Sequence, residues 1–464
     1  MTVRPVLTAE HYTVLAAGYL LMVVYGSLVP FAYRAVPLQE AMEQFSRLPY
    51  LRLGIEYRAD WVANILLFIP LSYLAMAALS VDRSRGAGAR AAILVVPCCL
   101  LLSAAIEFMQ IFFWPRTVSL NDMVAEGLGA VGGAGLWLGF GQRATRWGRR
   151  VWRSDLSGEL VGLLLPGYVA FLILIHVVPL DLTLSPAELY DKYREGRIRL
   201  LPLALPEGGV SGGIEDRMGN LVYFFPVGLS LAMSAGWRRE RREGLLPVAF
   251  ALGLPALVEL LQLFVYSRVF DSTDILTGTA AVLAGCFIGR LAARYAIGGG
   301  GERPETPAES SSPLGWATGV LVLLGWLGVL AIVSWQPFDF KADPALAARR
   351  FRRMYHIPFA DYYQQSEYQS IDHLTTTTLL YSPLGVLGAL CLPRMGGRMA
   401  GAIVAVGAAS VAAGYEAGQF LLPSRYPSVS DVLVGGLSGW LGFVLTSHLR
   451  AAANHSLICG MEKA

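Results

Sequence analysis

Four polar residues interrupt an apolar segment at fixed spacing, and the chain carries this set three times. The pattern is E-x2-Q-x5-R-x5-D, and its three copies are Glu107, Gln110, Arg116 and Asp122; Glu259, Gln262, Arg268 and Asp274; and Glu416, Gln419, Arg425 and Asp431. An ionisable group within an apolar layer is costly, which makes it a candidate for function. Carboxyl groups carry out acid–base chemistry, and an arginine can hold a phosphate through two hydrogen bonds.

A second, smaller set accompanies the first. Asp60 and Asn64 recur as Asp216 and Asn220, whereas Asp372 is followed by four threonines (375–378) where the others have asparagine. Copy three is therefore expected to serve as scaffold. Copy one has an additional acid, Glu126, where the other copies have glycine. We therefore expect copy one to be the working site.

Two interpretations of the repeated set are open. In the structural one, Asp122 and its equivalents are N-caps of a helix, and the arginine binds the carbonyls that end the preceding helix. Glutamate and glutamine then form hydrogen bonds between helices. In the functional one, Arg, Asn and Gln surround a pocket for the phosphate or sugar of a lipid headgroup.

The composition indicates an integral membrane protein. Of 464 residues, 55% are hydrophobic and 15% charged, against about 25% charged in soluble domains. A net charge of +3 gives no indication of nucleic-acid binding. The five cysteines show no CxxC spacing and the six histidines form no HxxxH pair. We expect no metal site and no cofactor.

The chain reads as three units of four apolar segments each, with Asp60, Asp216 and Asp372 expected to open the second helix of each unit. The predicted fold is an all-α polytopic membrane protein with about 12 spans in parallel repeats, since four is an even number. The predicted spans are 12–30, 60–80, 91–113 and 122–140; 159–180, 217–236, 245–266 and 274–293; and 314–336, 372–392, 400–422 and 431–449. The first segment is expected to be retained rather than cleaved as a signal peptide.

The connections predict domains and topology. The predicted domains are 1–150, 151–297, a flexible linker at 298–313, and 314–464. Short arginine-dense loops at 83–90, 142–153 and 237–243 are expected in the cytoplasm with both termini. The outer loops contain amphipathic segments at 36–53, 185–203 and 343–363, which suit a membrane interface.

This topology predicts that the polar residues converge at the outer boundary. If the third helix ends near Trp114, Glu107 lies roughly 10 Å below that end. Prolines in the second helix, Pro70 and Pro226, each free a backbone carbonyl for a neighbour or a cavity. Small residues four apart in the fourth helix, such as Gly129 and Gly133, predict close helix packing.

Together these motifs resemble the VanZ-like membrane proteins. The resemblance rests on the S-L-x-P corner after the first helix, the N-x5-P segment of the second, and the repeated four-residue motif. It covers nearly the whole chain as three tandem units, whereas one unit is usual. The resemblance implies a bacterial plasma-membrane protein of the cell envelope, in a family whose founding member is associated with teicoplanin resistance.

Three functions remain as hypotheses. The first is a non-catalytic protein that binds membrane lipids, and a lipid-linked envelope precursor or a glycopeptide, at the outer leaflet. The second is a transporter or flippase of such a precursor. The third is a membrane enzyme acting on a lipid-linked phosphate or sugar, which no nucleophile–base pair in the sequence favours.

Overall fold

A computed structural model of the chain describes residues 6–50, 55–153, 157–183, 185–203, 209–233, 245–298, 313–353, 357–362, 367–391 and 397–461. The chain divides into two compact units, which we describe separately. The first unit contains residues 1–153, which we call repeat 1. The second unit contains the helices of repeat 2 and repeat 3. Most of the predicted linker, residues 299–312, lies outside the described residues.

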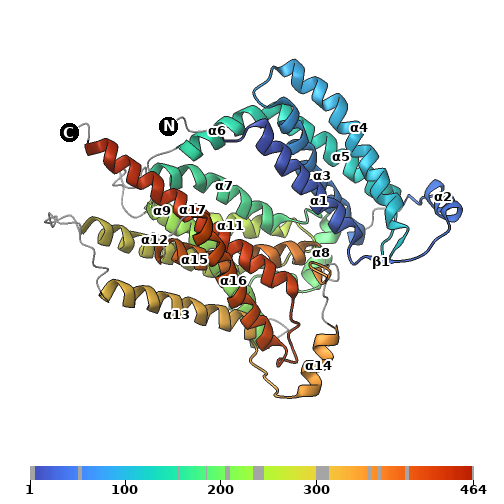
Figure 1. Cartoon of the computed structure of the whole chain (residues 1–464). Coiled ribbons are helices and arrows are strands. Elements are labelled where there is room, and N and C mark those ends of the chain that lie inside the picture. The colour runs from blue at the N-terminus through green and yellow to red at the C-terminus, as the bar shows by residue number, and fades with distance from the viewer. Residues whose placement is uncertain are drawn as a thin grey trace. The chain divides into compact units, whose positions relative to one another are not determined.

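Repeat 1 is a bundle of four long helices with short elements at both ends. Its elements are α1 (Ala9–Leu28), β1 (Ala32–Tyr33), α2 (Leu38–Ser46), α3 (Ile55–Ser80), α4 (Arg85–Gln110), β2 (Phe113–Trp114), α5 (Leu120–Leu136), the π-helix η1 (Trp137–Gly141) and α6 (Gln142–Arg153). Figure 1 shows α2 and β1 at one end of this bundle and α6 at the other. We call the end with α2 the loop end.

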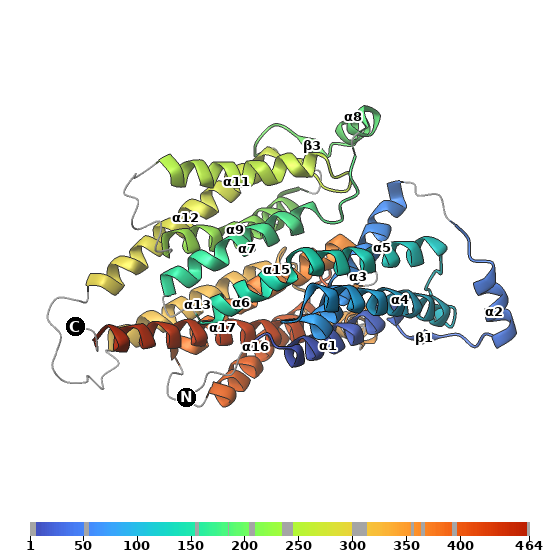
Figure 2. The ribbon, with the colours of Figure 1, turned by 90° about the horizontal axis from the view of Figure 1, so that it is seen from above.

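Repeats 2 and 3 follow the same order of elements. Repeat 2 contains α7 (Ser157–Val177), α8 (Pro186–Arg194), β3 (Ile198–Arg199), α9 (Gly209–Met233), α11 (Leu245–Leu263), β4 (Phe270–Asp271) and α12 (Ser272–Gly298). Repeat 3 contains α13 (Pro313–Trp335), α14 (Pro344–Arg353), α15 (Glu367–Cys391), α16 (Gly397–Gln419) and α17 (Val429–Met461). Figure 2 shows α8 and β3 together at one end of repeat 2.

The helices confirm an all-α polytopic membrane protein. Among the described residues, seven helices are long and apolar enough to cross a membrane, and four further apolar helices are shorter. Many large apolar side chains on these helices are exposed, including Leu21, Ile93 and Leu101. Such side chains suit contact with lipid tails rather than water.

Small residues bring the fourth helix of each repeat against the second, as their spacing predicts. A Cβ atom on Gly129 would lie 2.3 Å from the carbonyl oxygen of Ile65, and one on Gly133 would lie 2.2 Å from that of Ile69. Gly285 in repeat 2 and Gly442 in repeat 3 approach backbone carbonyls equally closely. Only glycine allows backbones to approach this closely, so the interface of α3 with α5 is fixed by these positions.

The first helix satisfies the backbone near each proline of the second helix. The hydroxyl of Tyr19 donates to the carbonyl of Leu67 at 3.1 Å, three residues before Pro70. In repeat 2, Tyr168 donates to Tyr223 at 2.9 Å, three residues before Pro226. In repeat 3, the indole of Trp326 donates to Leu380 at 2.9 Å. A neighbouring helix, not a cavity, therefore satisfies the carbonyl near each proline.

Several predicted boundaries are wrong. The second helices begin at Ile55, Gly209 and Glu367, so Asp60, Asp216 and Asp372 lie inside them. Residues 142–153 form α6, not a loop, because the backbone continues from α5 through η1 without a break. The predicted loop at 237–243 lies outside the described residues.

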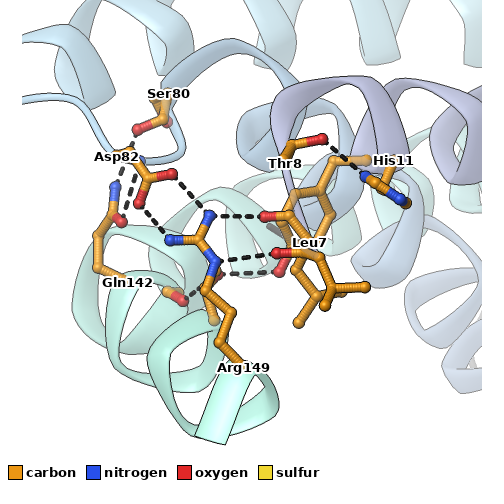
Figure 3. Close-up of polar contacts among 11 residues, drawn as sticks. Leu7, Thr8, His11, Ser80, Asp82, Gln142 and Arg149 are labelled. Carbon is orange, nitrogen blue, oxygen red and sulfur yellow. Dashed lines mark hydrogen bonds and ion pairs between the residues drawn. The ribbon is translucent and has the colours of Figure 1, made fainter. Parts of the chain in front are cut away.

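Arg149 of α6 ties three segments together at the end of repeat 1 opposite α2 (Figure 3). Its Nη1 and Nη2 atoms bind both carboxyl oxygens of Asp82, at 2.8 and 2.6 Å. Its Nε and Nη2 donate to the carbonyls of Val6 and Leu7 at 3.0 and 2.8 Å. Gln142 adds a hydrogen bond to the carbonyl of Ser80 at 2.9 Å. The start of α1, the α3–α4 turn and α6 therefore lie at the same end of the bundle.

Candidate functional site

The polar residues are positioned by a backbone corner that all three repeats share. The first helix of each repeat ends before a cis proline, Pro30, Pro179 or Pro337, and the next residue has a positive φ. The chain then passes the end of the third helix. There the backbone N–H of Arg34, Thr183 or Lys341 donates to the carbonyl of Phe112, Phe264 or Leu421, at 2.7–2.9 Å. The end of the first helix thus lies against the turn that carries the motif arginine.

The third helix ends at the motif glutamine or one residue after it, earlier than predicted. The helices α4, α11 and α16 end at Gln110, Leu263 and Gln419, so Glu107 lies one helical turn from the end of α4. The prediction of an end near Trp114 is wrong, because the chain leaves the helix through a turn closed by Phe112 N–H and Met109 O at 3.0 Å. Glu107 is therefore closer to the loop end than the predicted 10 Å.

Each motif glutamate accepts a backbone N–H from the turn that follows. Glu107 Oε2 accepts from Ser119 at 3.2 Å, Glu259 Oε2 from Asp271 at 2.9 Å, and Glu416 Oε2 from Ser428 at 2.7 Å. All three glutamates are buried. The donor is the residue immediately before the fourth helix. Its N–H has no acceptor within that helix, and the glutamate supplies one.

The helix caps differ from the predicted ones. The hydroxyl of Ser119 caps α5 by accepting from Asp122 N–H at 3.2 Å, and Ser428 caps α17 in the same way from Asp431. In repeat 2, Asp271 accepts from Thr273 N–H at 2.8 Å. The predicted N-caps, Asp122, Asp274 and Asp431, are wrong by three residues. They lie in the first helical turn, where a carboxylate still suits the positive helix end.

Each motif arginine binds the end of the first helix, not the third helix as the structural interpretation predicts. Arg116 donates to the carbonyl of Gly26, and Arg268 donates to that of Ile175 at 2.7 Å. Arg425 donates to Gln336 at 2.8 Å and to Val333 at 3.5 Å. Gly26, Ile175 and Val333 each precede the cis proline by four residues. The arginine therefore satisfies carbonyls that the helix itself leaves without donors.

The motif glutamine shares this role in two repeats. Gln110 Nε2 donates to the carbonyl of Ser27 at 2.9 Å, and Gln262 Nε2 donates to that of His176 at 3.3 Å. In repeat 3, Gln419 instead donates to Glu416 Oε1 at 3.1 Å. In repeats 1 and 2, the motif glutamine and the motif arginine therefore both donate hydrogen bonds to carbonyls at the end of the first helix.

The motif aspartates of repeats 1 and 3 have different partners, and the asparagine of repeat 2 binds a threonine. Asp122 accepts from Asn64 Nδ2 at 2.8 Å and from Ser119 Oγ at 2.7 Å. In repeat 2, Asn220 lies 3.5 Å from the hydroxyl of Thr277, three residues after Asp274. In repeat 3, His373 Nε2 lies 3.0 Å from both oxygens of Asp431.

His373 was missed by the sequence analysis. It precedes Thr376, the equivalent of Asn64, by one helical turn and presents its ring on the same face. A search for any polar residue one turn from the missing asparagine would have found it.

The aspartates of the second helix have different surroundings in repeats 1 and 3. Asp60 is exposed, and Asp372 accepts from the hydroxyl of Tyr223 at 3.0 Å within the second unit. Asp216 lies in α9, but its side chain is outside the described part of the chain. Asp60 nevertheless lies close enough to Asp122 for the two charges to interact, and the convergence of the six side chains stays a prediction.

Glu126 forms an acidic cluster with Glu107 and Asp122 in repeat 1. It is 3% exposed and Glu107 is 2% exposed. The carboxyl groups of Glu107, Asp122 and Glu126 are close enough for their charges to interact. The Ser103 hydroxyl lies close enough to the Glu126 carboxyl to interact with it, but among the described residues Glu126 Oε2 has no hydrogen-bond partner of good geometry. Repeat 1 thus contains a buried acid whose hydrogen bonds are incomplete, as expected for a residue kept for function.

The short helices of repeats 2 and 3 each contribute a buried cation, which the sequence analysis also missed. Lys192 of α8 is fully buried, and its ammonium donates to the carbonyls of Gln262, Leu263 and Val265 at 2.7, 3.1 and 2.7 Å. Arg350 of α14 donates to the carbonyls of Pro423 and Arg425. Both residues follow the cis proline of their repeat by thirteen positions, so an alignment of the outer loops on that proline would have found them.

Repeat 1 has a cavity beside the end of its third helix, where repeats 2 and 3 have Lys192 and Arg350. Its volume is about 480 Å³, and it lies beside the end of α4, as Ile111 in its lining indicates. The charged residues that line it are Arg34, Glu40, Glu43, Arg47 and Arg116. Of these, Arg34 donates to the carbonyl of Ile111 at 3.2 Å. A cavity of this size accommodates a small polar group such as a lipid headgroup.

A model of the VanZ/LLP1 family matches residues 14–141, 167–293 and 320–450. The chain belongs to the VanZ/LLP1 family. Each match includes one complete set of the four-residue motif, so the three sets are equivalent positions of three family units. No curated protein and no solved structure matches the chain.

Family membership and geometry together indicate different roles for the repeated motif and for the cavity. The contacts of Glu107 and Arg116 with backbone groups have counterparts in both other units of this VanZ/LLP1 chain, and that of Gln110 has one in repeat 2, as expected for a structural role. The cavity described above lies in repeat 1, and Glu126 has glycine at the equivalent positions of the other units. The ligand-binding role of the motif residues stays a prediction, and Arg116 is the motif residue that also lines the cavity.

Proposed function

We propose that this chain is a non-catalytic membrane protein of the bacterial cell envelope that binds the phosphate-bearing headgroup of a lipid or lipid-linked molecule. The cavity of repeat 1 carries this proposal, because three arginines line it. Arginine binds phosphate through a planar pair of donors and remains charged at every physiological pH. The lipid-linked precursors of the cell wall belong to this chemical class.

The surface of α2 supports a location at a lipid interface. Leu38 and Met42 lie one turn apart on α2 and are about 60% exposed (62% and 60%). The same helix contributes Glu40, Glu43 and Gln44 to the cavity. An amphipathic helix of this kind lies in the headgroup region with its apolar side chains in the acyl boundary. The cavity would then open where headgroups are found.

The proposed location is the plasma membrane, with the cavity at the outer leaflet and both termini in the cytoplasm. The predicted loop at 83–90 consists of the end of the α3–α4 turn and the first residues of α4. Its arginines support this orientation, since arginines close to the ends of membrane spans are enriched on the cytoplasmic side. Single cysteines at the exposed positions Arg83 and Thr117, in a chain without its five native cysteines, test it. An impermeant maleimide added to intact cells should label Thr117→Cys and not Arg83→Cys. The reverse pattern would refute the orientation.

Headgroup binding is tested by retention of dioleoyl-phosphatidylglycerol in native mass spectrometry of the purified protein. The double substitution Arg34→Ala with Arg47→Ala should reduce retention about a hundredfold or more, because it removes two charge-assisted hydrogen bonds of roughly 1.5–3 kcal/mol each. The matched control is Arg83→Ala with Arg90→Ala, two exposed arginines away from the cavity. Equal retention by both double variants would refute binding in the cavity.

A role in glycopeptide tolerance follows as part of this proposal. A protein that binds lipid-linked precursors at the outer leaflet changes how accessible they are to glycopeptides, which act on such precursors. The measurement is teicoplanin susceptibility of cells that produce the wild type, the Arg34→Ala and Arg47→Ala double variant, or the control. A wild type that changes susceptibility no more than the double variant would refute this part.

The acidic cluster favours transport as a second candidate. Glu126 is buried in a membrane helix with an incomplete hydrogen-bond set, and such acids often carry protons in transporters. Reconstituted protein would then move a fluorescent phospholipid between leaflets, and Glu126→Gln would slow that movement. Absence of movement with the wild type would leave binding as the function.

A further inference from the structure

The residue thirteen positions after the cis proline distinguishes repeat 1 from the other two. In α8 it is Lys192 and in α14 it is Arg350, and both bind carbonyls at or just after the end of the third helix. In α2 it is Glu43, which is exposed and lines the cavity. Repeats 2 and 3 therefore place their own cation beside the third helix, whereas repeat 1 has an acid at the aligned position.

The helix α2 brings acids to the cavity instead of a cation. Glu40 and Glu43 line it together with Gln44. Among the described residues, no ion pair within 4.0 Å joins either glutamate to Arg34 or Arg47, although all four line the same cavity. Arg34 and Arg47 thus lie in the same cavity as Glu40 and Glu43 without a direct ion pair to them in the described part of the chain.

We propose that the cavity of repeat 1 binds a zwitterionic aminophospholipid headgroup of the phosphatidylethanolamine type, its phosphate bound by Arg34, Arg47 and Arg116 and its ammonium by Glu40 and Glu43. The ammonium of the ligand then supplies the cation that Lys192 supplies in repeat 2. A primary ammonium has three N–H donors, which match carboxylate and carbonyl acceptors. A choline headgroup has no N–H donor and is excluded on that basis.

This inference rests on the proposed headgroup function but goes further, because phosphate binding alone requires no acids. Acids in a cavity for a purely anionic headgroup would repel it and weaken binding. With a zwitterionic ligand, both sets of charges contribute. The acids therefore predict selectivity among headgroups, which the arginines alone do not.

The test compares retention of dioleoyl-phosphatidylethanolamine, dioleoyl-phosphatidylglycerol and dioleoyl-phosphatidylcholine by the purified protein in native mass spectrometry. The wild type should retain phosphatidylethanolamine about tenfold more than either other lipid, since one or two charge-assisted hydrogen bonds separate them. The double substitution Glu40→Gln with Glu43→Gln should remove this preference and leave phosphatidylglycerol bound. Glu10→Gln, an exposed glutamate on α1, is the control and should keep the preference.

A second variant gives the protein the cation that repeat 1 lacks. Glu43→Lys should place an ammonium where the lipid ammonium binds, as Lys192 does in repeat 2, and should remove the preference for phosphatidylethanolamine. A Glu43→Lys protein that keeps the full preference would overturn the inference. Equal retention of phosphatidylethanolamine and phosphatidylglycerol by the wild type would overturn it too, while leaving the proposed headgroup function intact. Retention unaffected by the Arg34→Ala and Arg47→Ala double substitution would instead refute the proposed function itself.

Discussion

Arg268 donates a 2.7 Å hydrogen bond to the carbonyl oxygen of Ile175, which lies four residues before Pro179. Its equivalents Arg116 and Arg425 bind the first helix of their own repeats at the same position. The third and fourth helices of each repeat are thus attached to the first through one guanidinium. This attachment explains why all three copies keep the arginine.

The first prediction concerns this attachment. Arg268→Ala and Arg425→Ala should each lower the free energy of unfolding by roughly 2–4 kcal/mol, because carbonyls at the end of the first helix lose a charged donor. Arg116→Ala should do the same in repeat 1. Thermal unfolding of the purified protein in detergent measures the effect, and Arg146→Ala at an exposed position of α6 is the control. Variants as stable as this control would contradict the structural role of the arginines.

The second prediction concerns the buried acid of repeat 1. Glu126→Gln should raise the free energy of unfolding by about 1–3 kcal/mol, since it replaces an acid whose hydrogen bonds are incomplete and whose neighbours are acids. The new amide can donate to the carboxyl of Glu107 or Asp122. The same thermal unfolding experiment tests it, with Glu10→Gln as control. A marked loss of stability would show that the carboxylate of Glu126 has an essential structural partner.

The third prediction concerns the interface of α3 with α5. Gly133→Ala should destabilise the protein by roughly 1–3 kcal/mol or more, because the added Cβ would lie 2.2 Å from the carbonyl oxygen of Ile69. Gly135→Ala is a matched control two residues further along α5, where an added Cβ meets nothing within 4 Å. It should be neutral or slightly stabilising. Equal unfolding temperatures for the two alanine variants would contradict the close packing.

The fourth prediction concerns pH at the end of repeat 1 drawn in Figure 3. The hydrogen bonds from Arg149 hold the pKa of Asp82 below its ordinary value of 3.8. Because the folded-state pKa is lowered, the contribution of Asp82 to stability is complete above about pH 4 and is lost as the pH falls below it. The contribution is small, since the Asp82 side chain is 56% exposed.

Asp82→Asn provides the measurement for this pH dependence. Asparagine tolerates the positive φ of residue 82, so the substitution removes charge without backbone strain. The wild type should unfold at a higher temperature than Asp82→Asn at neutral pH, and the two should converge in acid. A difference that persists unchanged below about pH 3 would show that the stabilisation does not depend on the ionised carboxylate.

The sequence by itself determined the repeats, the membrane class and the contacts that are local in the chain. Glycines four residues apart on α5 predicted close packing, because positions i and i+4 share a helix face. Glu107 and its donor Ser119 are joined by one short turn, so their relation recurs wherever the spacing recurs. The family resemblance rested on these same spacings, and the family model matches all three units.

The tertiary structure decided which distant backbone each polar side chain binds. Gly26 is 90 residues before Arg116, and Ile175 is 93 before Arg268. Every residue has a carbonyl group, so the sequence carries no signal for which carbonyl is the acceptor. The same holds for Lys192, whose burial depends on how α8 folds back onto the end of α11. The cavity beside Gln44 likewise exists only where that fold brings α2, the β1 strand and the end of α4 together.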